Sequence, residues 1–483
     1  MDKKIDKINM FSNLNSHSLK SEFKNLRLPL VLGSLVGLLV LYLVSITGDW
    51  LFLFTMGLLL LGFASFARIQ QGSWLAPGAF FALYWAVFVL LALIILPDSS
   101  IQTKGILWIL FVVFAVYMGS IIGSGRMLSK MIPSSTEKQP LHQKYNLSLP
   151  WLSQITFLCS ILGLGAVIVL LLSIGQGFSS LFSSESMSQI GREYSLARYS
   201  DPSYRESSLA VALFTFIYLG ALFGGVLFAK ASSKIHRLIA LLPFIPAVGV
   251  AAILTTRGSL LFPLIMWVGA YFSTRVAIGK GTISLFSRRN IGLGLVLLLL
   301  ILIMITVMLM WRGGISGIDI HYLIFIGDQL RVDIFGSLAA FTQWFPTYWQ
   351  DNIPPSFGIF TFSRPLSILG IHPPWFLTGR VAEVGNFSTT IFTLFDTFIL
   401  DFTLVGSLLI FFIIGMLGGK AFYQLTKGKG KSIHLLILMV FYAITLTSFI
   451  GSPFCFTTLF LTWVAFIIYL LIIGIGREII KNY

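Results

Sequence analysis

Long runs of apolar residues recur along the chain, and they constrain its fold more than any other feature. An α-helix needs about 20 mostly apolar residues to cross a bilayer, where every backbone polar group must find its partner within the protein. The runs therefore predict an all-α polytopic integral membrane protein. We expect twelve transmembrane helices, at about 28–46, 50–67, 77–96, 105–124, 151–175, 208–229, 238–254, 259–275, 291–311, 402–419, 432–450 and 455–475.

The overall composition agrees with this fold class and excludes others. Of the 483 residues, 56% are hydrophobic and 11% are charged, whereas soluble globular chains carry about 25% charged residues. A soluble enzyme, a disordered protein and a nucleic-acid-binding domain are therefore excluded. The two cysteines, Cys159 and Cys455, both lie in apolar runs, so the sequence predicts neither a disulfide framework nor a zinc site.

The positive charges predict the orientation of the spans. With a cytoplasmic N-terminus, 24 of the 33 Lys and Arg residues fall in cytoplasmic segments, in agreement with the positive-inside rule. Both termini are then cytoplasmic, and the net charge of +15 mostly reflects topology rather than a nucleic-acid partner. The first run lacks an A-x-A cleavage site, so we expect it to be retained. The expected segments are a cytoplasmic tail (1–27), helices 1–5 (28–175), an outer loop (176–207), helices 6–9 (208–311), a large outer loop or cap (312–401), helices 10–12 (402–475) and a cytoplasmic tail (476–483).

The positive residues left on the outer side are almost all arginine. Eight of these nine residues are Arg, and orientation alone does not distinguish Arg from Lys. A guanidinium group offers a planar fork of donors that matches phosphate and carboxylate groups. We therefore expect the outer face to bind anions. Local ion pairs are the alternative, because 13 of the 18 acidic residues also lie on this side.

The loop at 312–401 is much longer than ordinary connections, and loops of this length are usually functional. Its proline and aromatic content predicts a compact cap with short helices, one of them at about 323–345. The aromatic side chains either stack on sugar rings or form an interfacial belt. They are Trp344, Phe345, Tyr348, Trp349, Trp375 and Phe376.

The apolar stretch 387–418 is too long for one untilted span. We expect an outer helix near the interface at about 387–400, followed by a span that begins at Phe402. Asp401 would then lie at the N-terminus of the span, where a carboxylate interacts favourably with the helix dipole. Arg257 lies in a tight turn between two short spans, and either snorkelling to the interface or contact with a buried anion explains it.

Three short motifs lie on the predicted outer side. They are T-T-R-G at 255–258, Gly385-Asn386 followed by Thr389 or Thr390, and L-D-F-T-L-V-G at 400–406. Together with the predicted arrangement of spans and loops, these motifs give the chain a pattern that resembles the Wzy-type O-antigen and exopolysaccharide repeat-unit polymerases. These are GT-C-like membrane glycosyltransferases. Asn386, Asp401, Phe402 and Gly406 match the pattern of that family, whereas Thr403 stands where glycine is usual.

This resemblance implies an enzyme of the bacterial inner membrane with its active site on the periplasmic side. Its substrates would be oligosaccharide repeat units linked to undecaprenyl diphosphate, and a chain-length regulator (a polysaccharide co-polymerase) and a flippase would be possible partners. The hydroxyl of one unit would attack the anomeric carbon of the other and expel the lipid diphosphate. We expect no cofactor and no metal, because the first outer loop offers only Asp49. The expected catalytic residues are His372, Glu383 and Asp401, and the expected diphosphate-binding residues are Arg198, Arg205, Arg257, Arg312, Arg331, Arg364, Arg380 and Asn386.

Two other functions remain open at this stage. An O-antigen ligase, which transfers the finished glycan to lipid A core, has a similar architecture and is barely separated from a polymerase by the sequence. A flippase for lipid-linked oligosaccharides is the non-enzymatic alternative. Transporters usually carry ionisable residues in the middle of spans and show repeated halves. Neither feature is evident in this sequence.

Overall fold

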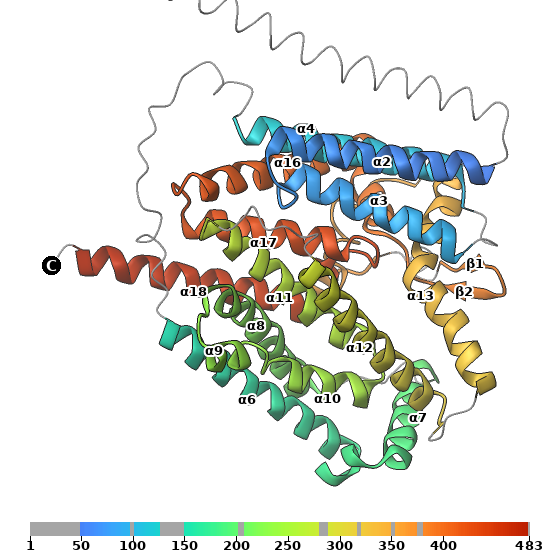
Figure 1. Ribbon diagram of the computed structural model, residues 1–483. Coiled ribbons are helices and arrows are strands. Elements are labelled where there is room, and N and C mark those ends of the chain that lie inside the picture. The colour runs from blue at the N-terminus through green and yellow to red at the C-terminus, as the bar shows by residue number, and fades with distance from the viewer. Residues whose placement is uncertain are drawn as a thin grey trace, which may run out of the picture.

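The computed structural model describes residues 49–96, 101–125, 149–200, 207–279, 288–315, 320–348, 353–373 and 380–481, and these ranges form a bundle of helices (Figure 1). The N-terminal tail, the first predicted span (28–46) and Arg205 lie outside the described residues. Side chains are not described for Arg198 or for residues 471–481.

Eight helical segments of the described chain are long and apolar enough to cross a membrane, and shorter apolar helices accompany them. Each predicted run within the described residues is mainly helical, although a turn at 240–243 divides the run at 238–254 and the run at 432–450 is helical only to Thr447. The long segments are α2 (Asp49–Gln71), α3 (Pro77–Ile95), α4 (Thr103–Gly123), α6 (Leu149–Ser173), α8 (Ser208–Lys230), α9 (Lys234–Ile239) continuing into α10 (Phe244–Leu254), α11 (Gly258–Ala277) and α16 (Leu394–Thr426). Shorter apolar stretches lie in α12 (Arg288–Arg312), α17 (Ser432–Thr447) and α18 (Thr457–Lys481).

Small residues bring α4 and α16 into close backbone contact. A Cβ atom added at Gly415 would lie 2.2 Å from the carbonyl oxygen of Val116, and one added at Gly419 would lie 2.2 Å from that of Ser120. Helices in membranes associate through such close packing, because apolar burial alone does not favour protein over lipid. Glycine at these positions therefore determines which helices become neighbours.

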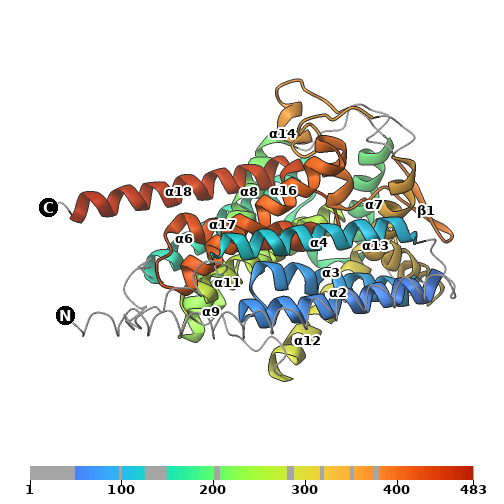
Figure 2. The same ribbon diagram turned by 90° about the horizontal axis from the view of Figure 1, so that it is seen from above.

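Most of the segments predicted to lie outside the membrane are at one end of the bundle, on the right in Figure 2, which we call the cap end, whereas residues 363–367 lie at the upper edge of that view. The segments are η3 (Phe178–Phe182), α7 (Ser184–Ser200), α13 (Ile320–Thr347), α14 (Ser363–Ser367) and the antiparallel strands β1 (Ala382–Val384) and β2 (Phe387–Thr389). Helix α13 confirms the helix predicted at about 323–345. Its C-terminal half packs by aromatic side chains on the spans, with Phe341 5.5 Å from Phe395 and Phe345 5.5 Å from Trp108 between ring centroids. Trp344 and Phe345 are thus buried packing residues.

The apolar stretch after residue 387 differs in part from the prediction. Residues 387–389 form a strand rather than a helix, because the two-residue turn Gly385-Asn386 pairs Val384 with Phe387. Helix α16 begins at Leu394 and is broken at Thr403, which has a φ of 65° and a ψ of 178°. A break in the helix is therefore present close to the predicted position, and it falls at Thr403.

Candidate functional site

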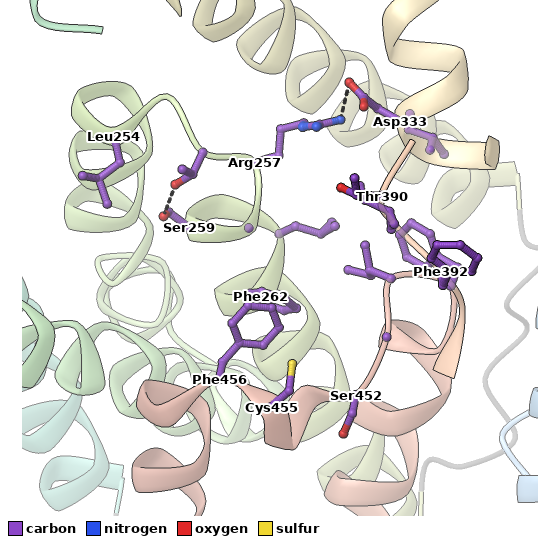
Figure 3. Close-up of a pocket in the computed structure, with 18 of the residues that line it drawn as sticks. Leu254, Arg257, Ser259, Phe262, Asp333, Thr390, Phe392, Ser452, Cys455 and Phe456 are labelled. Carbon is purple, nitrogen blue, oxygen red and sulfur yellow. Dashed lines mark hydrogen bonds and ion pairs between the residues drawn. The ribbon is translucent and has the colours of Figure 1, made fainter. Parts of the chain in front are cut away.

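A cavity of about 780 Å³ lies near the cap end, among α8, the turn between α10 and α11, α12, α13 and the loops before α16 and α18 (Figure 3). Its charged lining consists of Arg257, Arg312, Arg380, Asp333 and Asp396. Three of the arginines that the sequence singled out thus meet on one cavity. Two carboxylates meet them there, so the formal charge of the lining is +1.

Arg257 reaches the cavity from the T-T-R-G turn between α10 and α11. Thr255 ends α10 with a φ of 48°, and Thr256 Oγ1 lies 2.6 Å from Ser259 Oγ at the start of α11. The Arg257 side chain points across the cavity to α13, where Nη1 lies 2.5 Å from Asp333 Oδ2 (Figure 3). A β-branched residue with positive φ is a rare, strained conformation of the kind that clusters at functional sites.

Asp333 links two of the arginines electrostatically. Burial raises the pKa of the Asp333 carboxyl, while Arg257 and Arg312 act in the opposite direction. The carboxylate therefore gains a proton at a higher pH than an exposed aspartate would. When it does, the ion pair with Arg257 is lost and the guanidinium group can bind another anion.

Arg380 is held from several sides just before strand β1. Its Nη2 donates a hydrogen bond to Asp396 Oδ2 at 2.6 Å, and its guanidinium carbon lies 4.9 Å from the ring centroid of Trp344 and 4.5 Å from that of Phe392. The β1–β2 hairpin explains this arrangement, because it returns the chain and places Phe392 and Asp396 beside Arg380. Such contacts orient the planar group before any ligand arrives.

Arg312 ends α12, and the same helix forms an apolar wall of the cavity. Ile301, Leu302 and Ile305 line it together with Phe214 of α8. Ile301 precedes Arg312 by eleven residues, which corresponds to about 16 Å along a helix. The cavity therefore extends from a cationic end toward apolar side chains of the bundle, as an amphiphilic ligand requires.

Asp401 has a different environment from the other predicted catalytic residues. Its side chain is fully buried, and its oxygens accept hydrogen bonds from the hydroxyl groups of Ser356 and Thr361 and from the backbone N–H groups of Phe360 and Thr361, at 2.5–3.0 Å. We call this group of hydrogen bonds the Asp401 clasp. The clasp holds in place the chain segment that contains Phe360 and Ser363, two residues of the cavity wall.

The remaining predicted residues whose side chains the structure describes are not among those that line the cavity. Arg331 pairs with Asp328 one turn earlier on α13, with 3.2 Å between Nε and Oδ1. His372 and Arg364 are exposed, the latter on α14, and Glu383 and Asn386 are exposed on the β1–β2 hairpin. Asn386 acts here as a turn residue. Arg198 belongs to α7, and Arg205 lies outside the described chain.

Sequence reasoning did not single out the two carboxylates that complete the site. Neither Asp333 nor Asp396 is among the site residues predicted from the sequence. Asp333 lies 76 residues from its partner Arg257, and Asp396 lies beyond a hairpin from its partner Arg380. Asp396 did carry a signal, since it interrupts an apolar stretch. Among the described residues, no three His, Cys, Asp or Glu side chains are arranged to hold a metal ion.

Comparisons of the chain with models of protein families, with curated proteins and with solved structures gave no match.

Proposed function

We propose that this membrane protein is a polysaccharide polymerase that joins oligosaccharide repeat units linked to undecaprenyl diphosphate. The observation that carries the proposal is the meeting of Arg257, Arg312 and Arg380 on one cavity with an apolar wall. The cationic end suits a diphosphate, and the wall formed by α12 suits the lipid chain attached to it. In this proposal the cap end faces the periplasm, opposite the basic residues that end α2, α8 and α11.

The arginines would act on the leaving group. As the bond between the anomeric carbon and the diphosphate oxygen breaks, negative charge grows on the diphosphate, and preorganised guanidinium groups stabilise that charge. Arg380 is oriented by Trp344, Phe392 and Asp396. Arg257 becomes available when the diphosphate displaces Asp333.

We assign Asp333 as the cavity carboxylate that accepts the proton of the attacking hydroxyl. The raised pKa of its carboxyl makes it a stronger base than an exposed aspartate, and a base must lie on the cavity to reach the acceptor. The hydroxyl oxygen would then bond to the anomeric carbon of the donor while its proton passes to Asp333. The displaced undecaprenyl diphosphate would leave through the membrane, and a flippase would supply new units.

The test uses the purified protein in nanodiscs with undecaprenyl-diphosphate-linked repeat units and no other acceptor. A ladder of lengthening glycans supports the proposal, and its loss in Arg257→Lys shows that the bidentate fork matters rather than the charge. Arg331→Lys is the matched control, because Arg331 is paired with Asp328 and is not among the residues that line the cavity. Transfer only to an added lipid A core would instead identify a ligase, and transbilayer movement without glycan growth would identify a flippase.

A further inference from the structure

Residues 353–373, which we call the strap, lie between α13 and β1 in the chain and include α14. Their outward side chains are unusually apolar for a surface segment, since 80% of Phe357, 72% of Ile368 and 73% of Leu369 is exposed. Exposed apolar groups gathered in this way indicate a contact surface. The partner can be identified from the surroundings of the strap.

The inner side of the strap is tied to the rest of the chain. The Asp401 clasp holds residues 356–361, and the ring centroid of Phe362 lies 5.8 Å from that of Phe454 and 6.2 Å from that of Phe460. These contacts leave the apolar side chains of the other face directed away from the bundle core.

Phe357 shows that the outward direction is imposed by the fold. Its φ of 53° is strained for an aromatic residue, and its N–H donates a hydrogen bond to the Asp401 carbonyl oxygen at 2.9 Å. A strained residue persists only where the surrounding structure determines it. Here the strain presents an aromatic ring to the outside, which is favourable only if the ring leaves water.

The strap lies where a lipid-facing stripe ends. On α16, Val405, Leu409, Ile413 and Leu417 are exposed at intervals of four residues and therefore share one face. This face of a candidate membrane span extends for about 18 Å along the helix. The Phe357 N–H is hydrogen-bonded to the Asp401 carbonyl oxygen, and Asp401 precedes Val405 by four residues, so the strap lies beside the end of the apolar stripe.

The composition of the strap fits the same location. It contains no acidic residue, and Arg364 is exposed among its apolar side chains. Segments that lie in the bilayer interface combine apolar side chains with basic ones that attract anionic lipids.

We propose that the strap is an interfacial anchor on the cap side of the bilayer. Phe357, Ile368 and Leu369 insert at the boundary between headgroups and acyl chains, and Arg364 contacts lipid phosphate. The strap then separates the cavity, lined by Phe360 and Ser363, from the lipid. This proposal does not depend on the enzymatic activity, and it gives Arg364 a role other than binding the diphosphate.

The first experiment uses the wild-type protein in nanodiscs that contain phosphatidylglycerol with a diazirine at the start of its acyl chain. After photolysis, mass spectrometry should find the lipid on peptides from the strap and not on the β1–β2 hairpin, which belongs to the cap end. Equal labelling of the two segments, or none on the strap, would overturn the proposal.

The second experiment tests the basic residue. Arg364→Gln should reduce labelling of the strap by phosphatidylglycerol about two- to fivefold relative to phosphatidylcholine, as expected for one basic residue near an anionic surface. Arg331→Gln, which removes a partly exposed arginine of α13, should leave that ratio unchanged. An unchanged ratio in Arg364→Gln refutes the contact between Arg364 and lipid phosphate.

Discussion

Replacing Thr403 with glycine should stabilise the protein, because Thr403 holds a backbone conformation that is essentially restricted to glycine. Its φ of 65° and ψ of 178° interrupt α16 between the Asp401 clasp and the lipid-facing stripe. A residue held in such a region costs about 1–3 kcal/mol. Glycine loses about 0.5–1 kcal/mol more conformational entropy than alanine on folding. The net stabilisation expected for Thr403→Gly is therefore about 0.5–2 kcal/mol.

Thermal unfolding of the purified protein in detergent, followed by tryptophan fluorescence, measures this change. We expect Tm to rise by about 1–2 °C. The control is Thr397→Gly, in the regular part of the same helix, which should lower Tm because no strain is relieved there. If both variants lower Tm equally, Thr403 is not strained in the folded protein and the reasoning is refuted.

Three further variants test the clasp and the cavity. Asp401→Asn places an amide N–H₂ group against hydrogen-bond donors and should destabilise the protein by about 2–4 kcal/mol in the same assay; a loss no larger than that of Ser356→Ala would contradict the clasp. Asp333→Asn should strengthen pyrophosphate binding, measured by calorimetry, because Arg257 loses its partner. As pH falls through the raised pKa of Asp333, the carboxylate is protonated and the pyrophosphate affinity of the wild type should approach that of Asp333→Asn. If the affinities of the two proteins instead change in parallel with pH, pyrophosphate does not displace Asp333 from Arg257. Phe392→Leu should weaken pyrophosphate binding by about 0.5–2 kcal/mol, whereas Phe392→Tyr keeps the ring over Arg380 and should bind normally.

In the motif around Asp401, the structure agrees with the sequence-based expectation for Thr403 and differs from that for Asp401. The sequence singled out Thr403 because the family that this motif resembles usually has glycine at that position, and the structure shows a conformation there that favours glycine. The same motif suggested a catalytic or capping aspartate. The buried carboxylate instead has its hydrogen-bonding capacity filled by the strap, and nothing local to residues 400–406 specifies that partner.

The sequence by itself determined the membrane-spanning helices and the cap helix, because a long apolar run or an aromatic-rich loop is a property of neighbouring residues. It also identified a group of arginines, but not which of them share a cavity. Which arginines share the cavity depends on contacts between distant segments. Arg257 forms an ion pair with Asp333 of α13, and the β1–β2 hairpin reverses the chain so that Asp396 lies beside Arg380. Only the tertiary structure decides such pairings, since they follow from helix packing and chain reversal rather than from local periodicity.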